Sequence, residues 1–270
     1  NPKSRPNPLH YSIVKLLSAT GALRVVTTNF DVHFETALRE CNIKGQEVFR
    51  APALPVGNRF KGLVYLHGSV DGPADRLVLT DSDFGRAYLT EGWARRFLLE
   101  TYQEFTVLFI GYSHNDPVMS YLTRGLHPSA MKLRALTPDA SVARWQYLGI
   151  KPIAYSVGRG PNKHKVLVDA VGNLASLSSM GAFDHEQRLK KALSSAPPLP
   201  GSDENDYLLN CIQDNERRQL FMRHAEGLPW LLWADEHGIL DPLFQRIHFE
   251  GTAVWQLAGW FAQEYVLVHP

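Results

Sequence analysis

Arg24–Asp31, which reads RVVTTNFD, is the stretch that decides the fold. Its β-branched residues predict a short buried strand. The strand ends in Thr28, Asn29 and Asp31, directly before the amphipathic helical pattern of residues 32–38. In an open α/β sheet, ligands bind at the carboxyl ends of parallel strands. An amide beside a carboxylate at such an edge favours recognition of hydroxyl groups and an amide over phosphate. Asn and Asp also cap helices, and from this stretch alone capping is the more common role.

A second strand is predicted at residues 62–66, and it runs directly into His67, Gly68 and Ser69. A histidine at the end of a strand can turn its ring into a cleft, and a following glycine lets a substrate approach the backbone. A single histidine of this kind is more often structural than functional. A functional role for His67 therefore depends on whether other candidate residues lie beside it in the fold.

A third strand is predicted at residues 105–110, which are almost wholly apolar. It leads into Gly111, Tyr112 and Ser113, and then into a helix that begins with Asp116 as its cap. The N-terminus of such a helix presents free backbone N–H groups to an anion such as a pyrophosphate. Three strands with polar carboxyl ends predict one composite nucleotide site.

These three segments resemble the internal signatures of the sirtuin superfamily, and more narrowly the sirtuin-like domains of bacterial antiviral defence proteins. Their order is the same, and the 38-residue gap from Asn29 to His67 suits one intervening helix and strand. The resemblance covers roughly residues 8–178. It implies an α/β fold of the Rossmann type, with a mostly parallel sheet and helices on both faces.

The resemblance also implies roles for individual residues in cleavage of NAD between nicotinamide and ribose. Asn29 would position the attacking water and the ribose hydroxyls, and His67 would be the general base. Asp31 would accept a hydrogen bond from the nicotinamide carboxamide. Gly111 and Ser113 would contact the phosphate or the adenosine ribose. The residues that complete the predicted NAD-binding set are Thr27, Thr28, Gly68 and Tyr112.

The chain departs from the sirtuin pattern in its first 23 residues, which contain no Gly-rich loop. In sirtuins, that loop follows the first strand and lies against the phosphates of the dinucleotide. Here the chain begins at Asn1 with a Pro-rich segment, and Gly21 stands alone after the first predicted helix. We therefore expect a further strand and its loop to precede Asn1 in the complete protein.

Cysteine usage is the other departure. Protein-deacylating sirtuins carry a zinc module held by two Cys-x-x-Cys pairs, and a structural zinc site needs four nitrogen or sulfur ligands close together. This chain has two cysteines, Cys41 and Cys211, which are far apart in sequence. The sequence predicts no metal site. It favours hydrolysis of NAD itself over deacylation of a peptide.

Composition places the chain among proteins of the cytoplasm. The 270 residues are 44% apolar, enough to bury a substantial core, and two distant cysteines give no disulfide framework. The longest apolar runs are far shorter than a membrane span. The 28 basic and 27 acidic residues leave a net charge of +1, which gives no general attraction to nucleic acid. We expect no direct binding to nucleic acid or membranes.

The order of predicted elements divides the chain into three parts. Helices and strands alternate through residues 1–180, which we predict to be the catalytic domain. This part includes a brief strand at residues 77–80 and a helix that begins at Thr90. We predict a linker at residues 181–203, which becomes rich in Pro and Gly from Ala196, and an all-α region at 204–270. The aromatic helices of that region resemble the first turns of a helical-repeat array for sensing or assembly.

The resemblance thus implies an NAD glycohydrolase that acts as the effector of a prokaryotic antiviral, abortive-infection system. We expect NAD to be the substrate, the protein to be a homo-oligomer, and a phage protein or a partner subunit to be the trigger. Three alternatives stay open. They are a catalytically silent NAD or ADP-ribose sensor, an assembly module, and an NAD-dependent protein deacylase.

Overall fold

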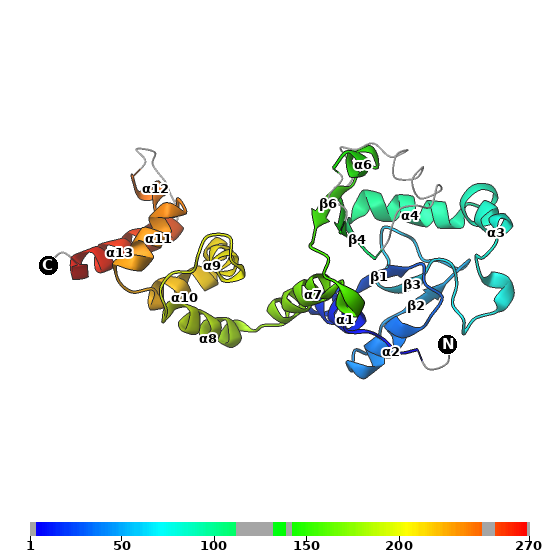
Figure 1. The fold of residues 1–270 in the computed structure, drawn as a ribbon, viewed down its shortest axis with the longest axis horizontal. Helices are drawn as coiled ribbons and strands as arrows, with labels where there is room; N and C mark the ends of the chain where they lie inside the picture. The colour runs from blue at the N-terminus through cyan, green and yellow to red at the C-terminus, as the bar shows by residue number, and fades with distance from the viewer. Residues whose placement is uncertain (1–3, 112–131, 139–141, 245–251, 269–270) are drawn as a thin grey trace. The chain divides into compact units, whose positions relative to one another are not determined.

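The computed structural model describes residues 4–111, 132–138, 142–244 and 252–268 (Figure 1). The chain divides into two compact units, Asn1–Ser179 and Met180–Pro270. Each unit has its own set of packed elements. The first contains both sheets, and the described part of the second consists of helices.

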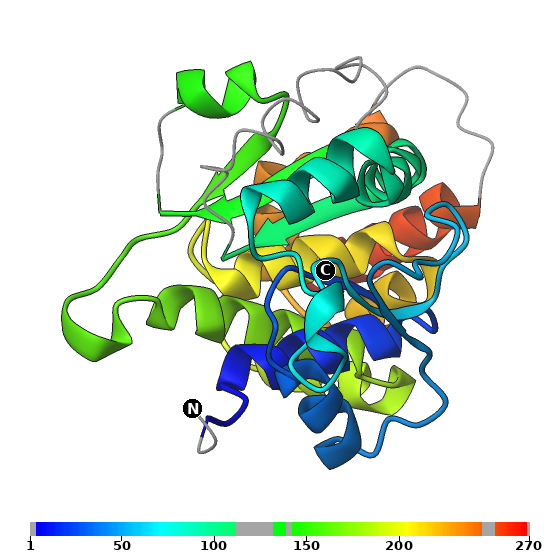
Figure 2. The ribbon, with the colours of Figure 1, turned by 90° about the vertical axis from the view of Figure 1, so that its right-hand side faces the viewer.

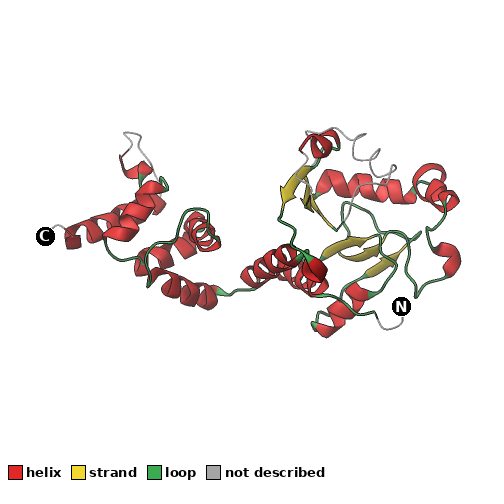
Figure 3. Ribbon diagram, in the orientation of Figure 1, coloured by secondary structure: helices red, strands yellow, loops and turns green. Residues whose placement is uncertain are grey.

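The first sheet has three parallel strands in the order β1-β3-β2 (Figure 3). They are β1 (Arg24–Thr27), β2 (Val48–Arg50) and β3 (Gly62–Tyr65). All four residues of the central strand β3 are buried, as an uninterrupted apolar run predicts. Thr27 of β1 and Arg50 of β2 both pair with Tyr65 of β3. The carboxyl ends of the three strands therefore meet at one edge of the sheet.

The second sheet also has three parallel strands, in the order β4-β5-β6. They are β4 (Thr106–Ile110), β5 (Lys132–Thr137) and β6 (Lys151–Ala154). We predicted one mostly parallel sheet, whereas the described strands form two separate parallel sheets. Among the described strands, β1 pairs only with β3, and β4 pairs only with β5. No hydrogen-bonded ladder therefore joins the two sheets within the described residues.

Two helices of the first unit, α1 and α3, begin at side-chain caps. Asn7 and His10 form a reciprocal capping box at the start of the first helix, and Thr80 and Asp83 form another at the third. The helices are α1 (Pro8–Ala19), α2 (His33–Glu40), α3 (Asp81–Gly85), α4 (Trp93–Glu104), α6 (Val142–Tyr147) and α7 (Lys165–Ser178). Shorter segments are the 3₁₀ turns η1 (Ala74–Arg76) and η4 (Gly160–Asn162), and the π-helix η2 (Arg86–Thr90).

The first sheet is covered on both faces. On one face, Val25, Leu63 and Tyr65 pack with Val14 of α1 and Leu38 of α2. Helix α7 lies beside α1 on the same side (Figures 1 and 2).

The opposite face of the first sheet belongs to a larger core that it shares with the second sheet. Val26 and Val64 of the first sheet pack with Phe97 of α4 and with Leu133 and Ala135 of β5. Parallel strands and helices on both faces confirm the α/β, Rossmann-like class, and the all-α region that follows is confirmed as well.

The second unit is built around a cluster of aromatic rings. Phe221 contacts Trp230, Trp233 and Trp260, with ring centroids 5.6 to 5.9 Å apart. Trp233 Nε1 donates a hydrogen bond to Asn205 Oδ1 at 2.9 Å. The helices are α8 (Ala182–Leu193), α9 (Asp203–Gln213), α10 (Asn215–His224), α11 (Leu228–Glu236), α12 (Asp241–Phe244) and α13 (Thr252–Val268).

Three local predictions are wrong. Residues 77–80 form no strand, because Val78 makes one backbone hydrogen bond, to His67 O at 3.0 Å, and no strand ladder follows. Helix α4 begins at Trp93 instead of Thr90, because Thr90 ends the π-helix η2 and Gly92 turns the backbone at φ +64°. The range predicted as a linker, 181–203, contains helix α8, whose apolar residues Leu189 and Leu193 are buried.

Within the described residues, no single helix is long and apolar enough to cross a membrane. The consecutive helices α7 and α8 pass that test of length and composition only when they are taken together as a bent pair.

Candidate functional site

The loops that follow β1 and β3 lie against each other at the carboxyl edge of the first sheet. Leu66 N–H donates a hydrogen bond to Thr27 O at 2.9 Å. Further out, Val70 N–H donates to Phe30 O at 2.8 Å. These two bonds bring the segment that contains Asn29 next to the segment that contains His67. The sequence predicted this pairing because parallel strands end at a common edge.

The turn after β1 separates a buried threonine from an exposed asparagine. Thr27 is 7% exposed, and its Oγ1 accepts a hydrogen bond from Asn29 N–H at 3.1 Å. Thr28 is half-buried. The Asn29 side chain has no hydrogen-bond partner among the described residues and is exposed. Thr27 therefore shapes the turn, and Asn29 offers a free amide at its tip.

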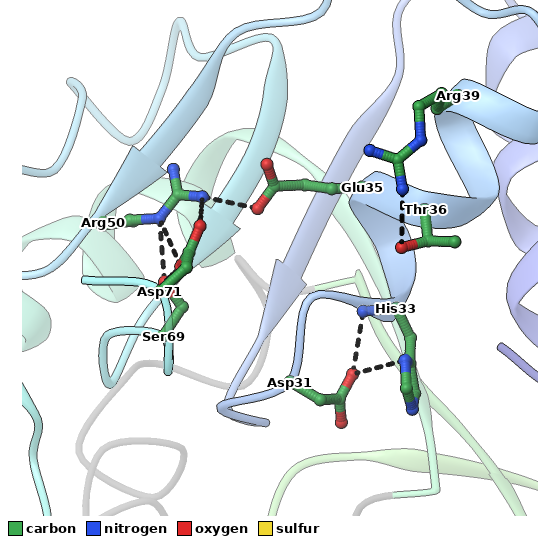
Figure 4. A network of polar contacts seen from close by, with 8 residues as sticks. All are labelled: Asp31, His33, Glu35, Thr36, Arg39, Arg50, Ser69 and Asp71. Carbon is green, nitrogen blue, oxygen red and sulfur yellow. Dashed lines mark hydrogen bonds and ion pairs between the residues drawn. The ribbon is translucent and has the colours of Figure 1, made fainter. Parts of the chain in front are cut away.

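Asp31 lies directly before Val32, the N-cap residue of α2, and its side chain bonds to the first residue of that helix. Its Oδ1 accepts a hydrogen bond from His33 N–H at 3.0 Å and lies 3.8 Å from His33 Nδ1 (Figure 4). This local bond from side chain to backbone is a structural role for Asp31, although the N-cap position itself belongs to Val32. The second role, contact with a nicotinamide carboxamide, stays a prediction.

His67 is held in an aromatic pocket. It is 7% exposed, and its Nε2 lies 2.9 Å from Tyr88 Oη. The Phe84 ring meets the imidazole edge-on, with centroids 5.1 Å apart. The sequence suggested a ring free to enter an open cleft. Instead, the ring is packed beneath the loop surface with one nitrogen bonded to a tyrosine.

Gly68 follows His67 at a position where a side chain does not fit. Its φ is +84°, in the region that L-residues rarely adopt. A Cβ at this position would lie 3.0 Å from Leu77 Cδ2 and 3.1 Å from Arg76 O. The glycine therefore lets the chain turn sharply after His67 and pack against the segment before α3.

After β4, the third strand of the predicted site, the structure describes the chain only as far as Gly111. This residue follows β4 at φ +69°, so the strand does end in a glycine turn. The predicted contacts of Tyr112 and Ser113, and the predicted helix cap Asp116, lie outside the described residues.

A charged network adjoins the His67 loop at the end of β2 (Figure 4). Arg50 Nη2 lies 2.6 Å from Glu35 Oε1 of α2 and 2.7 Å from Asp71 Oδ2. Arg50 Nε donates to Ser69 Oγ at 2.8 Å, and Ser69 in turn donates to Asp71. One guanidinium thus ties α2, β2 and the loop after β3 together.

The network fixes the charge state of its aspartate. Burial acts to raise the pKa of Asp71, but hydrogen bonds from Arg50 and Ser69 outweigh it and hold that pKa below its ordinary value. A cavity of about 70 Å³ lies beside the network and is lined by residues that include Gly68, Arg50 and Arg76. This volume is too small for a dinucleotide.

Sequence reasoning missed Arg50 and Tyr88. Arg50 ends a strand, as the predicted site residues do, but β2 has only three residues and gives a weak pattern. Tyr88 lies 21 residues after His67, and no local motif connects them. Among the described residues, no group of three or more His, Cys, Asp or Glu side chains could hold a metal ion.

Comparison with known proteins identifies a family domain within this chain. The family model of the SIR2-like domain matches residues 23–145, a range that contains Asn29, His67 and Gly111. The chain is also 27% identical over 289 residues to y4cA, an uncharacterized protein of Sinorhizobium fredii (strain NBRC 101917 / NGR234). That match covers 96% of this chain but 23% of the relative. Residues 23–145 therefore form a SIR2-like, or sirtuin-like, domain.

Proposed function

We propose that this chain carries the catalytic domain of an NAD glycohydrolase, which cleaves NAD to nicotinamide and ADP-ribose. The observation that carries the proposal is the junction of the β1 and β3 loops. The Val70–Phe30 hydrogen bond and the Leu66–Thr27 hydrogen bond place an exposed amide and an imidazole on neighbouring segments. A site for breaking a glycosidic bond to a cationic leaving group needs such groups to orient water and to take up its proton.

In this proposal, Asn29 holds the attacking water and the ribose hydroxyls. The bond between ribose C1′ and the nicotinamide nitrogen breaks, and a bond from C1′ to the water oxygen forms. The leaving nicotinamide takes the electron pair of the broken bond and becomes neutral. The proton released by the water passes to His67. Oriented dipoles that stabilise the positive charge of the oxocarbenium-like ribose and hold the attacking water would supply most of the rate enhancement.

Hydrolysis is favoured over protein deacylation by the cysteine content. Two cysteines in 270 residues cannot supply the four thiolates of the sirtuin zinc module. The loops that carry Asn29 and His67 are held together without such a module, because backbone hydrogen bonds join them directly.

One observation favours a rival function. His67 is buried and bonded to Tyr88, an arrangement that also suits a domain that binds NAD without turning it over. A silent sensor would bind NAD or ADP-ribose with measurable heat and leave the amount of NAD unchanged.

The decisive experiment is product analysis with the full chain. Incubation with NAD, followed by chromatography, should show nicotinamide and ADP-ribose in equal amounts. Binding by calorimetry without either product would support the sensor. Nicotinamide release that requires an acylated peptide, with O-acyl-ADP-ribose as the second product, would support the deacylase.

The biological setting that we propose is antiviral defence by NAD depletion, in a homo-oligomer that responds to a phage protein or a partner subunit. Support comes from the resemblance of the three strand-end segments to defence sirtuins and from the separate helical unit that follows. Cells that express the chain should lose NAD after phage challenge, whereas cells that express Asn29→Ala should keep it. Equal NAD levels in both strains after challenge would count against this setting.

A further inference from the structure

Arg50 bonds to both segments that follow the strands of the candidate site. Its guanidinium donates to Glu35 at 2.6 Å, and Glu35 lies in the first turn of α2, the helix that follows the β1 loop. The same guanidinium donates to Ser69 at 2.8 Å and to Asp71 at 2.7 Å in the β3 loop. Figure 4 shows these contacts converging on one side chain. Arg50 is therefore a bridge between the two segments.

The two β3-loop residues that Arg50 holds are the chain neighbours of Val70. Ser69 is 1% exposed and also donates a hydrogen bond to Asp71. Between them, Val70 N–H donates to Phe30 O at 2.8 Å, which is the outer of the two bonds that join the loops. Because both neighbours of Val70 are held, the direction of its N–H group depends on Arg50.

The position of Arg50 is itself set by the first sheet. Arg50 ends β2 and pairs in register with Tyr65 of β3. Tyr65 is fully buried, and the guanidinium of Arg50 lies 5.3 Å from the centroid of its ring. A guanidinium presents five N–H donors in one plane, so it can serve three acceptors at once, whereas a lysine cannot match that geometry. The bridge is thus built from a rigid strand.

We propose that Arg50 is a positioning residue, which holds the segment of Asn29 in register with the segment of His67. It acts through the Val70–Phe30 bond on one side and through α2 on the other. A displacement of about 1 Å between groups that act together can cost about 100-fold in rate. The inference rests on the proposed function, because the reaction that depends on this register is the cleavage of NAD.

The first test does not depend on catalysis. Amide hydrogen exchange of the full chain, followed by NMR, compares Val70 with Leu66, whose N–H makes the inner bond of the same junction. In Arg50→Gln, exchange at Val70 should become faster than in the wild type by a factor at least about tenfold larger than at Leu66. A general loss of stability would speed both amides by the same factor, and that result would overturn the proposal.

The second test measures NAD cleavage. Arg50→Gln should lower kcat about 10- to 100-fold and change KM less than about threefold, because the groups that bind NAD remain but their alignment is lost. The matched control is Arg188→Gln in the second unit. Arg188 has the same side-chain exposure as Arg50, 29%, pairs with Glu204 at 3.2 Å and lies over the Tyr207 ring. Arg188→Gln should leave kcat and the exchange rate of Val70 at their wild-type values.

The outcomes separate the two proposals. Selective loosening of Val70 in a chain that never cleaves NAD would support the hold of Arg50 on the junction and refute the glycohydrolase. Wild-type kcat in Arg50→Gln would refute the role of Arg50 and leave the glycohydrolase standing.

Arg50→Lys decides the question if Arg50→Gln does not fold. This variant keeps the positive charge and loses the planar set of donors. It should show the same selective change at Val70 and a smaller fall in kcat. Wild-type exchange and wild-type kcat in Arg50→Lys would overturn the proposal.

Discussion

Val70 N–H donates a hydrogen bond to Phe30 O at 2.8 Å, and this bond joins the two loops that carry the candidate site. The side chains of these two residues take no part in the proposed reaction. Their backbones nevertheless determine how far the segment of Asn29 lies from the segment of His67. We therefore expect changes in backbone geometry near this bond to affect function as much as changes in side chains do.

Gly68→Ala should lower the free energy of unfolding by about 1–2 kcal/mol, because φ of +84° is strained for alanine. The new Cβ would also press on Leu77 and Arg76 O. Urea denaturation measures the change. Gly85→Ala is the control: its φ is −56° and no atom lies within 4 Å of the added Cβ, so stability should rise by about 0.5–1 kcal/mol. Equal effects of the two substitutions would contradict the assignment of strain to Gly68.

Arg50→Gln should destabilise the fold by about 1 kcal/mol, since Glu35 and Asp71 lose their shared partner while both are partly exposed. It should also loosen the loop from Ser69 to Asp71, which hydrogen exchange of the backbone amides detects. Arg86→Gln removes a single ion pair with Asp83, in which Arg86 is more exposed than Arg50, and should leave the urea midpoint close to that of the wild type. If hydrogen exchange in the loop stayed at the wild-type rate in Arg50→Gln, the network would not hold the loop.

His10 should make stability depend on pH below neutrality. Burial lowers the pKa of His10 from its ordinary value; the charge of Asp31 opposes this shift, and His33 adds to it. The unfolded chain then binds the proton more readily, so the contribution of His10 is complete above about pH 6.5 and is lost as the pH falls below that value. Urea midpoints at pH 7.5 and 5.5 measure the loss.

The matched variant is His10→Gln, because glutamine can replace histidine in the capping box with Asn7. The wild type should lose more stability than this variant between the two pH values. Identical losses in both proteins would show that other groups carry the pH dependence.

The sequence predicted the parts of the fold that depend on local pattern. Apolar runs with β-branched residues located all three strands that carry the candidate site, and the shared edge of parallel strands predicted that Asn29 and His67 lie on neighbouring loops. It could not predict the burial of His67, because Phe84 and Tyr88 contact the His67 ring through tertiary packing. It could not separate the two sheets either, since strand periodicity does not specify which strands pair.

The short elements were the least predictable. Residues 77–80 have the composition of a strand. Because the backbone turns at Gly68, this segment packs against the His67 loop and makes one backbone hydrogen bond to it. Arg50 was overlooked because a three-residue strand carries almost no periodicity. In both cases, contacts distant in sequence decide the local structure.

The rate of nicotinamide release from NAD shows whether the β1 and β3 loops form an NAD-cleaving site. The comparison is between the wild-type full chain, Asn29→Ala, and the control Asn173→Ala on an exposed position of α7. Asn29→Ala should reduce the rate roughly 100-fold or more with an unchanged urea midpoint, because an oriented polar group in the site is lost. Asn173→Ala should match the wild type. Nicotinamide release by Asn29→Ala at the wild-type rate would contradict the account.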